Sequence, residues 1–380
     1  MKLEIHILQS FPPRNLNRDE NGMPKSCIFG GHPRARISSQ CQKRAVRLFY
    51  QENTSLSDRD LASRSRAWMP ELREVLIQSG GADTAQATIA AKLALEKLGA
   101  KIEGEKVESN TILFLGRTEI AAIADLLSKN WSDLAPKLHG DKPELPKDLG
   151  NAIEKALRSG GKPGDVALFG RMMAALPTVN VDAAVQVAHA IGVNALQQEF
   201  DFFTAVDDLA ASDDAGADHM GETGYNSATY YRFANLDTHQ LTKNLGSAAG
   251  ADTIARAFAE AFVKAIPSGH QNSFAAHSLP ALVLMVVRRG QPISLVDAFE
   301  NPVRPKAGLS LLDRSIQNLD RHWADLCTMY GDGGKAYVGI VTRQQLQQHL
   351  HHLKNNQKAS LDVLISGAIA AAFSAERGDA

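Results

Sequence analysis

Cysteine is scarce in this sequence. The 380 residues include three, at Cys27, Cys41 and Cys327, and no two of them form a Cys-x-x-Cys pair. This spacing excludes a disulfide framework and a zinc site built from thiolates, and it fits a protein of the reducing cytoplasm.

Long hydrophobic runs are absent too. The longest clean apolar run covers seven residues, Ala281 to Val287, whereas a membrane span needs about 20. Residues 1–4 lack the basic stretch and apolar segment of a secretory signal. With 44% hydrophobic residues the composition is that of an ordinary globular protein, and the length suggests about two domains. We therefore expect a cytoplasmic protein with no membrane partner.

Catalytic motifs are missing as well. Gly30 and Gly31 belong neither to a Gly-x-Gly-x-x-Gly loop nor to a Walker loop, and no nucleophile elbow occurs. No Ser/His/Asp or Cys/His set stands out from the sequence. We therefore expect a protein that is not an enzyme and needs no cofactor.

Charge is balanced overall but uneven along the chain. Lys and Arg number 41 and Asp and Glu number 42, which gives a net charge of −1. Residues 1–50 carry nine basic and three acidic residues, a net of +6, so −7 remains for residues 51–380. Such asymmetry indicates a local anion-binding surface on a nearly neutral body.

The basic surplus is centred on a predicted helix from residue 40 to about 52. Ser39 and Gln42 have the spacing of a capping box. One face of the helix carries polar and basic residues at positions i, i+3, i+4 and i+7, namely Gln40, Lys43, Arg44 and Arg47. We expect Cys41, Ala45 and Leu48 to turn toward the core.

This helix has two interpretations. Its amino end supplies unpaired amides, and Ser38 and Ser39 add hydroxyl groups, so it suits phosphate groups of a nucleic acid. Equally, most charged helix faces are simply solvated. Further basic residues precede the helix and favour nucleic acid modestly: Arg14, Arg18, Lys25, Arg34 and Arg36.

The remaining pattern predicts an α+β or α/β core with an inserted helical subdomain. Residues 53–165 are rich in Ala, Lys and Glu with helical periodicity, and we read them as the insertion. We expect strands at 2–9, 166–169, 229–233, 281–287 and 336–341. We expect helices at 182–191, 253–266, 310–330, 343–355 and 361–373.

The composition of residues 197–224 predicts a projecting loop. They contain eight acidic residues, no Lys or Arg, and an apolar cluster of Phe200, Phe202 and Phe203. Aromatic side chains on such a loop either anchor it to its own domain or stack against bases. Met172 likewise is either a core residue or a contact residue.

The acidic residues of the same loop suggest an alternative function. Asp207, Asp213 and His219 lie in the stretch 207–222, which a metal-dependent nuclease or hydrolase would use to hold a divalent cation. The one-three-five oxygen spacing and central glycine of a calcium loop are missing, however. A third interpretation is an RNA-binding protein that acts alone as a monomer.

Several motifs occur in a fixed order along the chain. They are Asn15-Leu-Asn-Arg-Asp19, Ile28-Phe-Gly-Gly31, Arg36-Ile-Ser-Ser-Gln40, Gly170-Arg-Met172, Ala188-His-Ala-Ile191, Phe203-Thr-Ala-Val-Asp-Asp-Leu209 and Tyr231-Arg-Phe-Ala-Asn235. In this order the sequence resembles the CasC family, the repeated crRNA-binding backbone subunit of the type I-E CRISPR Cascade surveillance complex. The resemblance covers residues 1–50 and 165–330 well and the rest of the chain less closely.

The resemblance implies a fold and a set of partners. It implies an RNA-recognition-motif-like (ferredoxin-like) palm from residues 1–52 and 166–380, helical fingers at 53–165 and a thumb loop at 197–224. Copies would stack head to tail along the crRNA and present it for pairing with target DNA in antiviral defence. Other Cascade subunits, and indirectly a helicase-nuclease, would be further partners.

The resemblance also implies site residues. Arg18, Lys25, Ser38, Gln40, Lys43, Arg44 and Arg47 would hold RNA phosphates. Met172 would pack against a base beside a kink in the guide. Phe202, Phe203 and Thr204 would form the wedge of the thumb.

Overall fold

The computed structural model describes residues 1–53, 55–80, 82–103, 106–139, 142–205, 219–331 and 333–374. The protein has a mixed α+β fold, as predicted. It divides into two compact units, each taken by itself below. The first comprises residues 1–50, 186–237 and 255–380, and the second comprises residues 51–185 and 238–254. The insertion predicted at 53–165 lies inside the second unit.

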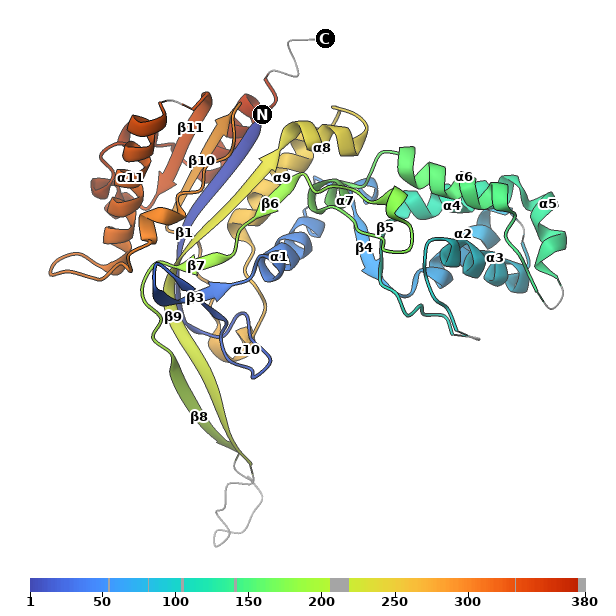
Figure 1. Ribbon diagram of the computed structural model, residues 1–380, viewed down its shortest axis with the longest axis horizontal. Helices are drawn as coiled ribbons and strands as arrows, with labels where there is room; N and C mark the ends of the chain where they lie inside the picture. Colours follow the sequence, from blue (N-terminus) through green and yellow to red (C-terminus); the bar gives the residue numbers. More distant parts are fainter. Residues whose placement is uncertain are drawn as a thin grey trace, which may run out of the picture. The chain divides into compact units, whose positions relative to one another are not determined.

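An antiparallel sheet forms the body of the first unit (Figure 1). Its main path runs in the order β11-β10-β1-β9-β7-β3-β2, and β6 and β8 also pair with β9. The strands are β1 (Lys2–Arg14), β2 (Ser26–Phe29), β3 (His32–Ile37), β6 (Val185–Val187), β7 (Ala190–Gly192), β8 (Glu199–Ala205), β9 (His219–Asp237), β10 (Leu282–Arg288) and β11 (Lys335–Thr342).

Strand β1 lies at the centre of the sheet because both of its edges are paired. It is antiparallel to β10 on one side and to β9 on the other. The predicted strand at 2–9 continues to Arg14, and the register shifts between Phe11 and Arg14, where Pro12 and Pro13 lie. Proline lacks an amide hydrogen, so such an irregularity is where a strand accommodates it.

The helices of the first unit are α1 (Ser39–Gln51), α9 (Ala251–Lys264), α10 (Gln271–Phe274), α11 (Leu311–Tyr330) and α12 (Leu361–Ala372). Short 3-10 turns are η4 (Val296–Phe299), η5 (Gln344–His349) and η6 (Lys354–Asn356). Apolar residues of α11 pack on one face of the sheet, with Ile316 and Trp323 in one cluster with Leu284. Helix α9 is tied to the sheet through Arg232, which donates to the carbonyl of Phe262.

The order of the elements defines the topology of this unit. Along the chain β1, α1, β7, β9, α9 and β10 follow one another, and in the sheet the corresponding strands lie in the order β10-β1-β9-β7. The pairings between these strands are antiparallel. This is a β-α-β-β-α-β succession.

The predicted loop at 197–224 is largely a β-hairpin. Strands β8 and β9 pair from Glu199 with Tyr225 to Ala205 with His219, and residues 206–218 lie outside the described residues. Figure 1 shows the hairpin of β8 and β9 extending away from the sheet, and strand β9 belongs to both the sheet and the hairpin. The sequence alternates polar Glu199 and Asp201 with Phe200 and Phe202, which is the period of a strand.

The second unit is mainly helical, with one small sheet of β4 (Ala62–Ser65) and β5 (Leu113–Gly116). Its helices are α2 (Trp68–Gly80), α3 (Thr84–Lys97), α4 (Arg117–Lys129), α5 (Trp131–Leu134), α6 (Lys147–Ser159), α7 (Gly164–Phe169) and α8 (Thr238–Leu245), and its 3-10 turns are η1 (Asp58–Asp60), η2 (Ala135–Leu138) and η3 (Pro177–Val179). Leucine and alanine side chains from α2, α3, α4 and α6 form its core.

Three predicted elements are wrong. Residues 166–169 form the end of helix α7 and not a strand, because Pro163 precedes the helix and Asp165 lies in its first turn. Residues 182–191 contain strands β6 and β7 and not a helix. Residues 343–355 contain the 3-10 turn η5 and part of η6 and not a continuous helix.

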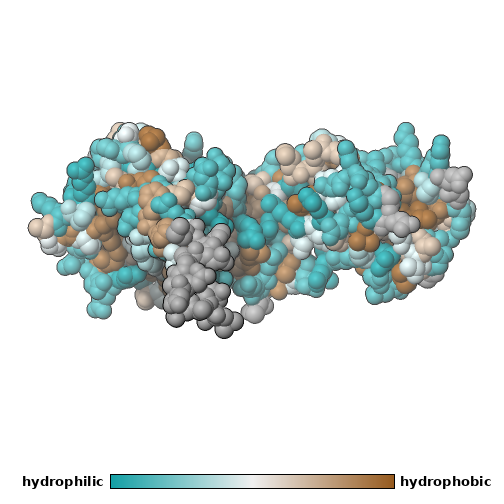
Figure 2. Space-filling view, turned by 90° about the horizontal axis from the view of Figure 1, so that it is seen from below, coloured by the Kyte–Doolittle hydropathy of each residue, from teal (hydrophilic) through white to brown (hydrophobic). Residues whose placement is uncertain are grey.

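The predicted strands at 281–287 and 336–341 and the helices at 253–266, 310–330 and 361–373 are confirmed within a few residues. The predicted strand at 229–233 is confirmed as part of β9, which begins ten residues earlier, at His219. In the described part of the chain, no helix is both long and apolar enough to span a membrane. On the face seen in Figure 2, hydrophobic residues occur in small groups among hydrophilic ones.

Candidate functional site

Helix α1 begins directly after strand β3, and its first turn is fixed by two side chains. Ser38 is the N-cap, because its Oγ accepts a hydrogen bond from the amide of Cys41 at 3.2 Å. The amide of Ser38 in turn donates to Oδ1 of Asn17 at 2.8 Å. The predicted capping box of Ser39 and Gln42 is therefore wrong: the cap is one residue earlier, and Asn17 takes the place of the glutamine as acceptor for the cap amide.

The buried face of α1 also differs from the prediction. Gln42, Val46 and Tyr50 are the buried residues, whereas Leu48, predicted to face the core together with Cys41 and Ala45, is exposed. Gln42 enters the interior because its amide is satisfied there. Its Nε2 donates to the carbonyl of Ala188 at 2.9 Å, and its Oε1 accepts from Nε of Arg232 at 3.2 Å.

The polar face of α1 is open to solvent, as the sequence predicts. Gln40 and Arg44 are exposed, and Lys43 and Arg47 are half-buried. Lys25, from the segment before β2, belongs to the same cluster because its charge and that of Lys43 both act on one nearby histidine. Neither lysine, nor Arg44, forms an ion pair with any residue that the structure describes.

That histidine, His189, is a residue that sequence reasoning missed. Its Nδ1 accepts from the amide of Ser39 at 3.2 Å, and Nη1 of Arg36 lies 3.4 Å from the same atom. Burial lowers the pKa of His189, and the charges of Arg36, Lys25 and Lys43 lower it further. The neutral ring therefore accepts the hydrogen bond of one amide, that of Ser39, at the amino end of α1. Its place in the motif Ala188-His-Ala-Ile191 was the available signal.

Arg18 is exposed on the segment between β1 and β2. Its Nη1 lies 2.7 Å from Nε2 of His270, which precedes α10. The structure thus brings a second histidine into contact with a predicted phosphate ligand.

Two other basic residues before α1 are structural. Arg34 is buried and donates to four carbonyls, of Gly192, Val193, Phe299 and Glu300. Arg14 is buried with its guanidinium 4.3 Å from the ring centre of Tyr230. The prediction that these two arginines contribute to a nucleic-acid surface is therefore wrong.

The aromatic residues of the hairpin are accessible. Phe202 is 64% exposed and Phe203 49% exposed, and Thr204 is exposed as well. Phe203 lies over Gly221 on the paired strand, because a Cβ at Gly221 would come within 2.3 Å of its ring. The interpretation of these phenylalanines as anchors buried in their own domain is therefore wrong.

Met172 lies in the second unit and is 83% exposed, so it is not a core residue. The turn before it requires Gly170, which has φ +74 and whose Cβ would come within 2.7 Å of the carbonyl of Val181. Arg171 is buried and forms an ion pair of 2.8 Å with Glu119. The two neighbours of Met172, Arg171 and Met173, are thus fixed inside while Met172 projects outward.

The acidic alternative depends mostly on residues that the structure leaves undescribed. Asp207 and Asp213 lie outside the described residues, and of His219 only the backbone pairing is described. In the described part of the chain, no three His, Cys, Asp or Glu side chains come together as a metal site.

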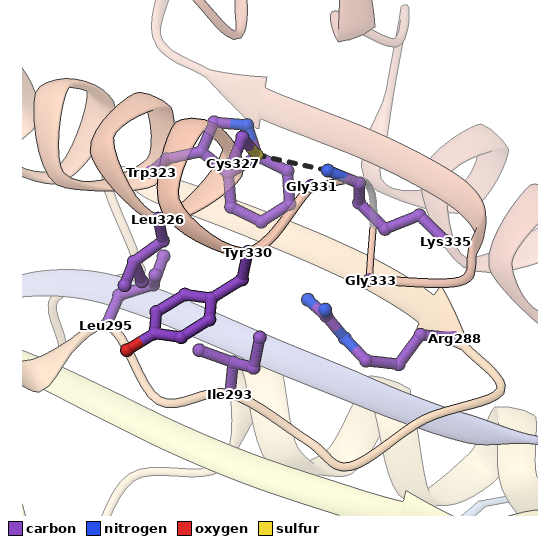
Figure 3. A pocket seen from close by; sticks show the side chains of 10 residues that line it. All are labelled: Arg288, Ile293, Leu295, Trp323, Leu326, Cys327, Tyr330, Gly331, Gly333 and Lys335. Atoms are coloured by element: carbon purple, nitrogen blue, oxygen red, sulfur yellow. Dashed lines mark hydrogen bonds between the residues drawn. The ribbon is translucent and has the colours of Figure 1, made fainter.

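A cavity beside α11 has a different character. Trp323, Tyr330 and Lys335 are among its lining residues, and Nζ of Lys335 lies 3.0 Å from Sγ of Cys327 (Figure 3). Its volume of about 20 Å³ is room for about one water molecule. It is too small for a nucleotide.

Comparison with known proteins identifies the family. The model of the CT1975-like protein family matches residues 3–367. The chain belongs to this family. The family predicted from the sequence, that of CasC, is thereby confirmed.

Two solved structures are similar over nearly the whole chain. One is a chain of a "CRISPR RNA-guided surveillance complex, pre-nicking", with 34% sequence identity and a TM-score of 0.83, covering 98% of this chain and 100% of that one. The other is a chain of a "CRISPR RNA-guided surveillance complex", with 27% identity and a TM-score of 0.73 at the same coverage. No curated protein matches the chain.

Proposed function

We propose that this protein is a non-catalytic crRNA-binding backbone subunit of a type I-E Cascade surveillance complex. Copies stack head to tail along the guide RNA and present it for pairing with target DNA. Other Cascade subunits complete the assembly, which recruits a helicase-nuclease. Family membership and the two similar surveillance-complex chains support this proposal.

The single observation that carries it is the group of basic side chains at the start of α1. Lys25, Lys43 and Arg44 have no acidic partner among the described residues, and the helix end adds a positive dipole. A folded protein ordinarily scatters or pairs its charges, so an unpaired group of one sign at a helix amino end favours a polyanion.

The topology supports a ferredoxin-like palm in this unit. The succession β1-α1-β7-β9-α9-β10, with the strand order β10-β1-β9-β7, is the arrangement from which sheet-based RNA-binding modules are built. In this assignment the second unit is the fingers, and the hairpin of β8 and β9 is the thumb.

The proposed contacts are divided between three places. Arg18, Lys25, Ser38, Gln40, Lys43, Arg44 and Arg47 hold phosphates. Met172 packs against a base, and Phe202, Phe203 and Thr204 press on the RNA from the hairpin. Their exposure supports these roles for the aromatic residues and for Met172. Ser38 is 6% exposed, its Oγ accepts the cap bond from Cys41, and its hydroxyl donates to no residue that the structure describes.

The test is the salt dependence of RNA binding. Each phosphate contact contributes about 0.7 to the slope of log affinity against log salt for a single strand. The double variant Lys43→Ala/Arg44→Ala is therefore expected to lower the slope by about 1.4. Anisotropy of a fluorescein-labelled single-stranded RNA, titrated at several salt concentrations, measures it.

A matched control is Arg343→Ala/Lys354→Ala, which removes two exposed charges from the C-terminal part of the same unit. Its slope is expected to remain that of the wild type. An equal fall in both double variants would show that general charge, and not the start of α1, binds the RNA. Divalent-metal-dependent cleavage of the probe, lost in Asp207→Ala, would instead favour the nuclease.

A further inference from the structure

We propose that His270 is a positioning residue that holds the guanidinium of Arg18 in its RNA-binding orientation. This inference rests on the proposed function and adds to it a residue outside the predicted site. His270 contacts Arg18 although it lies 252 positions further along the chain.

The contact has a defined direction. Nη1 of Arg18 lies 2.7 Å from Nε2 of His270, and a guanidinium can only donate. Nε2 therefore accepts, and the ring is neutral with its proton on Nδ1. Burial and the charge of Arg18 both lower the pKa of His270, which keeps the ring in this form at neutral pH.

The backbone around His270 is held in an unusual conformation. His270 has φ +50 and Ala275 has φ +46, and these two residues flank α10. Residues other than glycine rarely adopt positive φ, and they keep it where the surroundings over-determine the structure. At Gly269 a Cβ would come within 2.3 Å of the carbonyl of Leu16, so this segment packs closely against the chain just before Arg18.

Ring contacts connect His270 to the base of the hairpin. Its ring is stacked with Phe274, with ring centres 6.2 Å apart and planes at 15°. Phe274 in turn lies 5.9 Å from the ring of Tyr225, the β9 residue that pairs with Glu199. The hydroxyl of Tyr225 donates to Glu199 at 3.2 Å. The side chain that orients Arg18 is thus connected through Phe274 to Tyr225 of β9, the strand that pairs with Phe202 and Phe203 of β8.

A surface arginine has many rotamers, and ordering it on binding costs conformational entropy. An acceptor that fixes the guanidinium beforehand removes part of that entropic cost. A carboxylate would do so but would also neutralise the charge of Arg18, whereas a neutral acceptor leaves that charge in place. Histidine in the neutral form meets both conditions. Arg18 pairs here with an imidazole, and it forms no ion pair with an acid among the described residues.

The test is a double-mutant cycle in the full-length protein, with the same labelled RNA. Arg18→Ala is expected to lower the salt slope by about 0.7. His270→Ala is expected to weaken RNA binding in the wild-type background and to have no effect in the Arg18→Ala background, because its role passes through Arg18. His270→Gln, whose Oε1 accepts a hydrogen bond, is expected to restore binding.

The matched control is His277→Ala, an exposed histidine of the same segment, which is expected to bind like the wild type. If His270→Ala does not fold, His270→Asn takes its place, since asparagine tolerates positive φ and its shorter side chain does not reach Arg18. Equal losses from His270→Ala in both backgrounds would overturn the inference. If Arg18→Ala and Lys43→Ala/Arg44→Ala both keep the wild-type slope, the proposed function itself fails.

Discussion

Two histidines each accept a hydrogen bond from a group of the cationic surface. His189 accepts the amide of Ser39 at the start of α1, and His270 accepts from Arg18. In both, burial and neighbouring positive charges lower the pKa. Each is therefore a neutral acceptor in the free protein, placed where a polyanion would change the local field.

For His189 this leads to a pH prediction. RNA phosphates offset the charges of Arg36, Lys25 and Lys43, so the pKa of His189 rises when RNA binds and the complex takes up a proton. RNA affinity is then expected to increase as the pH falls from 8 to 6, by less than about tenfold per pH unit for one proton.

His189→Gln, which keeps an acceptor but does not titrate, is expected to show a weaker dependence of RNA affinity on pH. The same pH dependence in both proteins would contradict this role. Anisotropy titrations at fixed salt measure it.

At this scale the sequence predicts exposed polar side chains better than buried ones. Lys43 and Arg44 are accessible as their helical spacing indicates, whereas Arg34 and Gln42 are buried. Their burial depends on the carbonyls of Phe299, in η4, and of Ala188, between β6 and β7, which come near only in the folded chain. A single sequence carries no local sign of such partners.

Elements with a clear period, or with a long apolar run such as that of β10, were predictable, and shorter apolar segments were not. Helix α11 and strand β1 have clear periods, but residues 166–169 offer only four apolar positions, which fit a strand or a helix equally. Residues 182–191 contain four alanines, which suggested a helix, although Val185 and Val187 alternate with Gln186 as in a strand. Tertiary pairing with β9 decides the outcome there.

The hairpin gives a prediction at the scale of an element. Gly221→Ala places a methyl group where the ring of Phe203 lies, so the ring must move. We expect this variant to behave like Phe203→Ala: it keeps the salt slope of the wild type and loses the fluorescence increase of a reporter base at the kinked position of the RNA. Thr223→Ala, on the same strand, is the control. An unchanged fluorescence signal in Gly221→Ala would count against the wedge.

At the scale of the whole molecule, the proposed head-to-tail contact would join two different surfaces and leave one surface open at each end of a row. In the proposed function, assembly would then be limited by the RNA and not by a closed ring. The acidic residues of the hairpin, Glu199, Asp201 and Glu222, would face a basic neighbour in such an arrangement.

The corresponding prediction concerns stoichiometry. The number of copies bound is expected to rise in equal increments with the length of a single-stranded RNA, and the assemblies are expected to dissociate as salt increases. Native mass spectrometry with RNAs of graded length measures both. One copy per RNA at every length would favour a protein that acts alone as a monomer.

Strand β9 continues without a break from His219 to Asp237, so the same backbone pairs with β1 in the sheet and with β8 in the hairpin. A projection joined by a loop would swing, whereas one made from a sheet strand inherits the twist and direction of that sheet. In a row of identical subunits this would set a constant pitch, and the interval between contacts would be a property of the fold, whichever nucleotides it meets.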